Sequence, residues 1–145
     1  MSKAKRFKLR GYNEVEYFWV YIYDSLKEMR RDCNKHGGIN GYGNSDTSEA
    51  LAIVEPYTRV KIHEDGSEEV LPNIGIIRLV KNKLHTHIVS HELVHAAMHH
   101  YRLTQKDGIA NFGDNNCQAE EDFGFIYCKY FSKMSKQLYK HGFWK

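Results

Sequence analysis

The spacing of two histidines around a glutamate constrains the fold of this chain more than any other feature of its sequence. Residues 91 to 95 read His-Glu-Leu-Val-His. In an α-helix, residues four apart lie on one face and one turn apart, so a helix places the imidazoles of His91 and His95 side by side. Glu92 then lies about 100° around the helix axis from His91. The motif therefore predicts a helix that presents two imidazoles with a carboxylate beside them.

The sequence on both sides of this motif agrees with a helix and predicts a strand before it. Apolar residues flank the motif at 84–89 and 96–98, which favours a helix from about residue 84 to 103. The earlier run over 74–80, Ile-Gly-Ile-Ile-Arg-Leu-Val, is rich in β-branched residues and is typical of a strand. The chain is thus expected to pass from a strand directly into the histidine-bearing helix.

A pair of imidazoles on one helix face is suited to bind one Zn²⁺ through ring nitrogens. A carboxylate beside the pair is placed to hold a water that the metal acidifies and to take its proton, which is chemistry used to hydrolyse amides. These residue types predict His91 and His95 as metal ligands, Zn²⁺ as the cofactor and Glu92 as the general base.

The third ligand is not expected on the same helix. The longer pattern His-Glu-x-x-His-x-x-Gly-x-x-His would need glycine at 98 and histidine at 101, where this chain has Met98 and Tyr101. His99 continues the column of histidines, but eight residues of helix carry it about 12 Å along the axis from His91. One ion cannot be reached by all three, so the ligand must come from another element.

The motif resembles that of zincins, in which the strand before the metal helix pairs by its edge with an extended peptide substrate. Gluzincins take their third ligand, a glutamate, from the opening turns of a second helix. The apolar pattern over 118–140 predicts such a helix after a loop rich in glycine, asparagine and aspartate at 107–116. Glu121 is the predicted ligand and Glu120 the alternative.

The preference for Glu121 rests on helix packing. Gly124 and Cys128 follow Glu121 on the same helix face and are small enough to let two helices approach closely. The equivalent positions after Glu120 carry large aromatic rings, Phe123 and Tyr127.

Beyond the motif, most of the chain resembles small zincin-like metallopeptidase proteins encoded by bacteriophages and prophages. The matching stretches are 20–30, 73–79, 91–101, 113–121, 138–139 and 142–144. The resemblance implies an α+β fold, a single minimal zincin-like domain over residues 1–145. A small, mainly antiparallel sheet would pack on the metal helix and the C-terminal glutamate-bearing helix. It also implies zinc-dependent hydrolysis of a peptide or protein substrate in the host cytoplasm.

Composition is consistent with one cytoplasmic domain. The length of 145 residues suits a single hydrophobic core. No uncharged run approaches the roughly 18 residues of a membrane span, and residues 1–11 lack the apolar region of a secretory signal. Three widely spaced cysteines, Cys33, Cys117 and Cys128, favour reduced thiols over a disulfide framework.

The remaining elements are predicted more coarsely. A weak alternation suggests an edge strand or a basic arm at 5–10, and 14–33 reads as a helix, with a strand over 18–23 as the alternative. The other predictions are strands at 50–54 and 57–63, a hairpin turn at Asp65-Gly66 with its return at 68–71, a loop at 37–48, and a helix end at Gly142.

Several residues carry supporting hypotheses. His87, His99 or a tyrosine would supply an extra donor for the oxyanion, and Asp114 or Asp122 would accept a hydrogen bond from a ligand imidazole. The net charge of +3 and two groups of basic residues leave nucleic-acid binding as an alternative function; these residues are 3–10 together with Lys129, Lys133, Lys136 and Lys140. A non-catalytic, zinc-stabilised interaction protein is a further alternative, although such a site has no use for Glu92.

Overall fold

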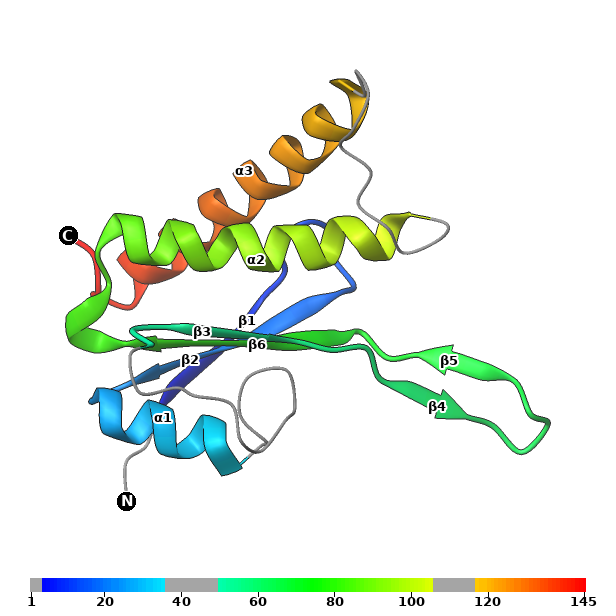
Figure 1. Ribbon diagram of the computed structural model, residues 1–145, viewed down its shortest axis with the longest axis horizontal. Helices are drawn as coiled ribbons and strands as arrows, with labels where there is room; N and C mark the ends of the chain where they lie inside the picture. The colour runs from blue at the N-terminus through cyan, green and yellow to red at the C-terminus, as the bar shows by residue number, and fades with distance from the viewer. Residues whose placement is uncertain (1–3, 36–49, 106–116) are drawn as a thin grey trace.

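A mixed four-stranded sheet forms the centre of the computed structural model, which describes residues 4–35, 50–105 and 117–145 (Figure 1). The strands are β1 (Lys5–Leu9), β2 (Tyr17–Tyr23), β6 (Asn73–Val80) and β3 (Ile53–Pro56), in that spatial order. β1 runs antiparallel to β2, β2 parallel to β6, and β6 antiparallel to β3. The predicted α+β fold class is confirmed.

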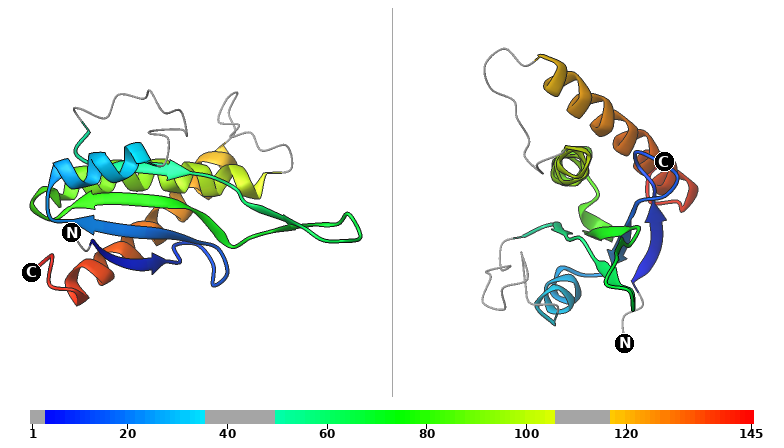
Figure 2. Two further views of the ribbon diagram at one scale, coloured as in Figure 1. Left: turned by 90° about the horizontal axis from the view of Figure 1, so that it is seen from below. Right: turned by 90° about the vertical axis from the view of Figure 1, so that its right-hand side faces the viewer.

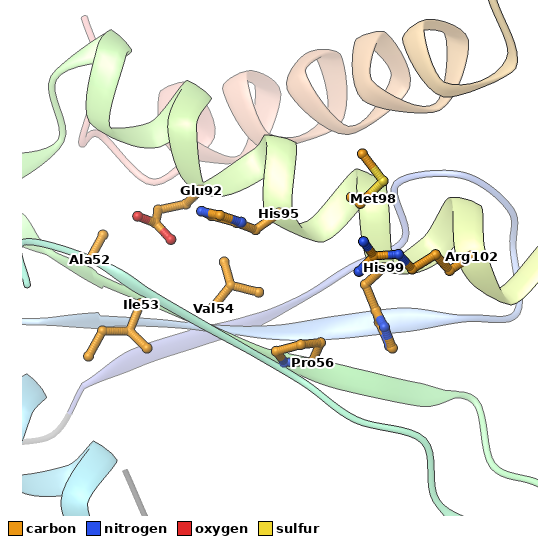
Figure 3. Close-up of a pocket in the computed structure, with 9 residues that line it drawn as sticks. All are labelled: Ala52, Ile53, Val54, Pro56, Glu92, His95, Met98, His99 and Arg102. Carbon is orange, nitrogen blue, oxygen red and sulfur yellow. The ribbon is translucent and has the colours of Figure 1, made fainter. Parts of the chain in front are cut away.

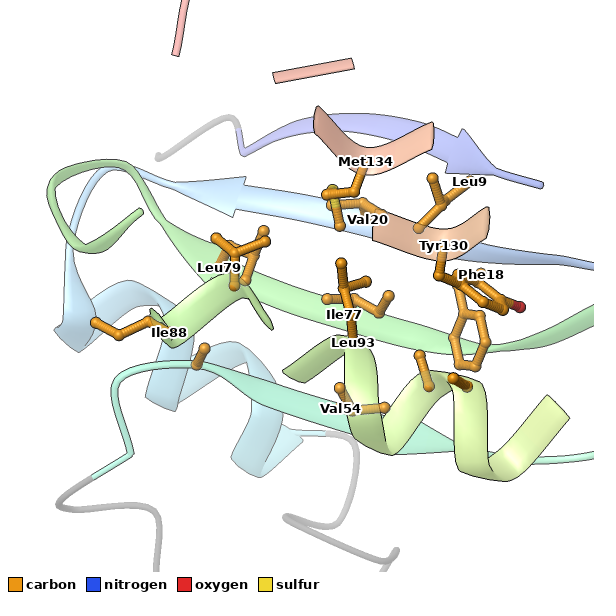
Figure 4. Close-up of a cluster of buried hydrophobic side chains, with 14 of the residues drawn as sticks. Leu9, Phe18, Val20, Val54, Ile77, Leu79, Ile88, Leu93, Tyr130 and Met134 are labelled. Atoms are coloured by element: carbon orange, nitrogen blue, oxygen red, sulfur yellow. The ribbon is translucent and has the colours of Figure 1, made fainter. Parts of the chain in front are cut away.

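Helices cover the two faces of this sheet. The helices α2 (Thr86–Thr104) and α3 (Cys117–Lys140) lie on one face, and the shorter α1 (Leu26–Lys35) lies on the other (Figure 2). The main core forms between the sheet and α2–α3, where Phe18, Ile77, Leu93, Tyr130 and Met134 are almost completely buried (Figure 4). Burying one such aliphatic side chain stabilises the fold by about 1.5–3 kcal/mol, so this layer holds α2 firmly against the sheet.

β6 is an interior strand, which corrects the expectation that residues 74–80 pair by their edge with a substrate. Every residue of Asn73–Val80 is buried, and β2 and β3 occupy its two edges. A continuous apolar run is typical of a strand buried on both faces. The edge strand beside α2 is β3 instead.

The segment 14–33 is not one helix, because its first half forms β2. Phe18, Val20 and Ile22 point into the main core, while the aromatic residues between them lie on the opposite face of the sheet. A period of two is the geometry of a strand, so the alternative interpretation over 18–23 is the correct one. Ser25 then accepts a hydrogen bond from the Glu28 amide at its side-chain hydroxyl, which caps the start of α1.

Two predicted turns are confirmed by positive backbone φ angles. Gly66, with φ of 84°, closes the hairpin of β4 (Val60–Ile62) and β5 (Glu68–Val70), which extends beyond the sheet (Figure 1). Gly142, with φ of 79°, ends α3, where the Phe143 amide donates to the Leu138 carbonyl over 2.9 Å. The chain then returns to the start of α2, and the Trp144 indole donates to the carbonyl of Leu84 over 2.7 Å.

The described helices include none that is long and apolar enough to cross a membrane. Cys33 is a buried free thiol and Cys128 an exposed one. The predicted loops at 37–48 and 107–116 lie outside the described residues.

Candidate metal centre

His91 and His95 lie one turn apart on the exposed side of α2, as predicted. Their Nε2 atoms are 3.2 Å apart, and their ring centroids are separated by 4.9 Å. Two nitrogens bound to one tetrahedral Zn²⁺ at about 2.0–2.1 Å each would be about 3.3–3.4 Å apart. The two imidazoles are therefore spaced as ligands of a single zinc ion.

The electrostatic environment favours the ligand form of the second histidine. Partial burial lowers the pKa of His95, and the neighbouring charge of His91 lowers it further. Neutral imidazole is the form that binds a metal. The lowered pKa therefore favours the neutral His95 imidazole, whose unprotonated ring nitrogen can bind a metal.

Glu92 occupies a different environment from the histidines on either side of it. Its side chain is buried beneath them, with only 8% of its surface exposed. Burial raises the pKa of Glu92, an effect only partly offset by the charge of His91. A carboxylate whose pKa moves toward neutrality is a stronger base, so the location of Glu92 suits proton transfer.

A pocket of about 480 Å³ separates this part of α2 from β3. The Glu92 carboxylate and the His95 ring lie side by side and point into it (Figure 3). The opposite wall is formed by residues of the edge strand β3, Ile53, Val54 and Pro56, together with the preceding Ala52. Within the described residues, β3 pairs only with β6, so the edge of β3 on the pocket side has no strand partner.

The structure does not bring the predicted third ligand to the histidines. No group of three His, Cys, Asp or Glu side chains within the described residues is arranged to hold a metal. Glu120 and Glu121 are both exposed near the start of α3. Their assignment as a ligand stays a prediction.

The packing reason for choosing Glu121 over Glu120 is wrong. Cys128 is exposed, and a Cβ added to Gly124 would meet nothing within 4 Å. The side of α3 that packs against α2 carries rings instead: Phe123 contacts Tyr101 edge to face, and Tyr127 is hydrogen-bonded to Ser90. Helix contact is thus made through the large residues that follow Glu120.

Of the residues predicted to assist the metal site and found in the described part of the chain, His99 lies at the pocket, whereas His87 and Asp122 do not line it. His99 lines the pocket, where its Nε2 lies 3.2 Å from the Tyr57 carbonyl oxygen. His87 is exposed and stacked on His85, and Asp122 accepts a hydrogen bond from Gln118. Asp114 lies outside the described residues.

Two further residues of α2 complete the pocket and were not predicted from sequence. Met98 and Arg102 line it beyond His95 (Figure 3). Together with His91 and His95 they follow the spacing i, i+4, i+7, i+11 of one helix face, and this periodicity was the signal that could have identified them. Arg102 places a positive charge at one end of the pocket.

Comparison with protein-family models, curated proteins and solved structures finds no match to this chain.

Proposed function

We propose that this protein is a zinc-dependent metallopeptidase. The observation that carries the proposal is the 3.2 Å separation of the His91 and His95 Nε2 atoms, beside a pocket that His95 and the buried Glu92 line. A non-catalytic zinc site needs the two imidazoles, but it gains nothing from burying a carboxylate beside them.

The residues divide the chemistry between them. His91 and His95 would hold Zn²⁺, with Glu121 or Glu120 as the proposed third ligand. The bound metal would supply Lewis acidity toward a water and toward the carbonyl of the scissile peptide bond. Glu92 takes a proton from the attacking water and delivers it to the amine that leaves.

The edge strand β3 is the part of the pocket that would bind the substrate backbone. An extended peptide adds to an open sheet edge through main-chain hydrogen bonds, whereas side-chain pockets provide selectivity. The edge of β3 faces Glu92 and His95 across the pocket, so a peptide paired with it would place its backbone next to the catalytic carboxylate. Pro56 has no amide hydrogen and limits the length of this pairing.

Purified protein is expected to bind about one Zn²⁺ per chain, since the imidazole pair forms a single site. Elemental analysis of protein prepared without added metal, followed by zinc titration, measures the stoichiometry. Substitution of both histidines, His91→Asn with His95→Asn, should abolish binding, whereas His87→Asn on the same helix should leave it unchanged. A wild-type stoichiometry near zero that zinc addition does not raise would contradict the site.

The predicted third ligand can be tested separately. If Glu121 is the third ligand, Glu121→Gln weakens zinc retention against a competing chelator more than Glu120→Gln does, because loss of a ligand carboxylate removes a coordinate bond. The exposed Asp122→Asn on the same turn is the control. The reverse ranking would assign the metal to Glu120, in agreement with the side of α3 that packs against α2.

Activity can be sought without knowing the natural substrate. A library of peptides derived from a bacterial lysate is incubated with the zinc-loaded protein, and new termini are identified by mass spectrometry. Cleavage that stops on addition of a zinc chelator and returns with Zn²⁺ supports the proposal. Zinc binding without cleavage of any peptide would favour the non-catalytic interaction protein.

A further inference from the structure

The sheet face opposite α2 and α3 carries a row of aromatic rings. Tyr17, Trp19 and Tyr21 alternate along β2 with the core residues and are all half-buried. Trp19 and Tyr21 are nearly parallel, at an interplanar angle of 16°, and Tyr17 meets Trp19 edge to face. The helix α1 packs on this face around Tyr23, Met29 and Cys33. Tyr21 lies at the margin of that cluster, and the rings of the row keep part of their surface exposed.

Basic side chains of β1 lie beside this row. Arg6 pairs with Tyr21 and Lys8 with Trp19 in the antiparallel register, which places these cations on the same face as the rings. The Lys8 Nζ lies 4.7 Å from the Tyr17 centroid and 5.3 Å from that of Trp19. The guanidinium groups of Arg6 and Arg10 lie 5.1 Å and 5.4 Å from Trp19 and Tyr17.

The positive charge of this surface is not neutralised by the described residues. None of their ion pairs includes Arg6, Lys8 or Arg10, all of which are exposed. Basic residues on an edge strand also discourage pairing with other strands. That role accounts for the cations, but it does not account for the row of half-exposed rings on the neighbouring strand.

We propose that Arg6, Lys8, Arg10, Tyr17, Trp19 and Tyr21 form a binding surface for single-stranded nucleic acid. Unpaired bases stack on aromatic side chains, and the phosphates between them bind to lysine and arginine. Both kinds of side chain are present here: the basic residues lie on β1 and the aromatic residues lie opposite them on the neighbouring β2. Duplex DNA hides its base faces within the stack and offers only phosphates to this surface. The rings and cations contact bases and phosphates, so DNA and RNA strands bind alike.

This surface is separate from the candidate metal centre. The helix α1 lies on one face of the sheet and α2 on the opposite face (Figure 2). The rings of β2 alternate with its core residues and are on the α1 face, whereas His91, Glu92 and His95 belong to α2. The second basic group of the sequence, the lysines of α3, belongs to a helix on the metal-site face. The proposed nucleic-acid surface therefore involves the N-terminal basic group and not the lysines of α3. The proposed binding is independent of the proposed peptidase activity.

Fluorescence anisotropy of a labelled oligo(dT) strand of about 15 nucleotides, near the upper site size of a single-strand-binding fold, tests the proposal. Trp19→Ala is expected to weaken binding roughly 5- to 150-fold, as the loss of one stacked base implies. Lys8→Gln should weaken binding and lower the slope of log affinity against log salt by about 0.7, the value for one phosphate contact on a single strand. Circular dichroism of each variant verifies that it is folded.

Lys5→Gln is the matched control. Lys5 is an exposed cation on the same strand, but its Nζ lies over the ring of Phe143 on the other face of the sheet. The Lys5→Gln substitution removes the same charge as Lys8→Gln and should leave the affinity for oligo(dT) nearly unchanged. Equal losses from Lys5→Gln and Lys8→Gln would show attraction by net charge alone and overturn the proposal.

A second measurement does not depend on a variant of the surface itself. In a Trp144→Phe background, Trp19 is the single tryptophan, and stacking with a base should quench its emission as oligo(dT) is added. The matching oligo(U) should quench equally, and duplex DNA of the same length should compete weakly. Absence of quenching at low salt, or equal competition by duplex, would overturn the proposal.

Discussion

Glu92→Gln is expected to lower the rate of peptide hydrolysis by about 10²–10⁴-fold while zinc stays bound. The amide has nearly the same shape as the carboxylate but cannot take a proton from water. Glu92 lies about 100° around the helix from His91, so its substitution leaves the two imidazoles in place. The measurement is kcat/KM on a peptide found in the lysate library, with zinc content determined on the same sample.

Two control variants make this result specific. Glu92→Asp keeps the carboxylate but shortens it by one methylene, so it should retain more activity than Glu92→Gln. Glu14→Gln removes an exposed carboxylate from a loop that does not line the pocket and should have no effect. Cleavage that persists at the wild-type rate in zinc-loaded Glu92→Gln would exclude Glu92 as the general base.

The parts of the candidate site that the sequence predicts are those determined by a single helix. The spacing of His91 and His95 implies their adjacency once the segment is helical, and the structure confirms it with Nε2 atoms 3.2 Å apart. The burial of Glu92 depends on the strand that α2 faces, and β3 lies more than thirty residues earlier in the chain. Local periodicity contains no information about such a distant neighbour.

The mistaken choice of helix face at Glu121 has a different origin. The apolar positions Ile126, Tyr130 and Met134 are visible in the sequence, and they are the buried side of α3. That side is turned away from Gly124 and Cys128. The hypothesis assumed that small residues mark a helix contact, although the hydrophobic period of the same helix already indicated another face.

Arg78 shows why a charged residue inside an apolar run is difficult to interpret from sequence. It lies in β6, is completely buried, and points toward the α1 side of the sheet. Its guanidinium donates to Asp32 over 2.9 Å, to the Tyr23 hydroxyl over 2.6 Å and to Glu55 over 3.1 Å. These partners come from α1, β2 and β3, which only the folded sheet brings together.

A thiol extends this buried network. The Cys33 Sγ donates to a Glu55 carboxylate oxygen over 3.2 Å. Burial, followed by the hydrogen bond to Glu55, raises the pKa of Cys33 to about 12, so the thiol keeps its proton. Glu55 therefore accepts from both Arg78 and Cys33. Glu55 lies in β3 between Val54 and Pro56, which line the pocket. The network therefore holds β3, the strand proposed to bind the substrate, against β6.

Arg78→Met is expected to lower the free energy of unfolding by about 3–5 kcal/mol. The substitution removes the cation but leaves the Glu55 carboxylate, which is only 10% exposed, without its charged partner. Asp32 is more accessible and regains water, so most of the cost arises at Glu55. Urea denaturation measures the loss, and the exposed Arg31→Met on α1 should change stability by no more than about 0.5 kcal/mol.

A double-mutant cycle distinguishes two causes of the lost stability: the uncompensated charge of Glu55 and the loss of packing contacts of Arg78. If the cost arises from an uncompensated carboxylate, Arg78→Met combined with Glu55→Gln should be less destabilising than Arg78→Met alone, because the second substitution removes that charge. If the cost were only lost contacts of the arginine side chain, the two changes would add. Arg78→Lys should fall between wild type and Arg78→Met, since an ammonium keeps the charge but cannot reach Asp32 and Glu55 with a planar fork. A loss below 1 kcal/mol for Arg78→Met would show that the network contributes little to stability and that other contacts hold β3 in place.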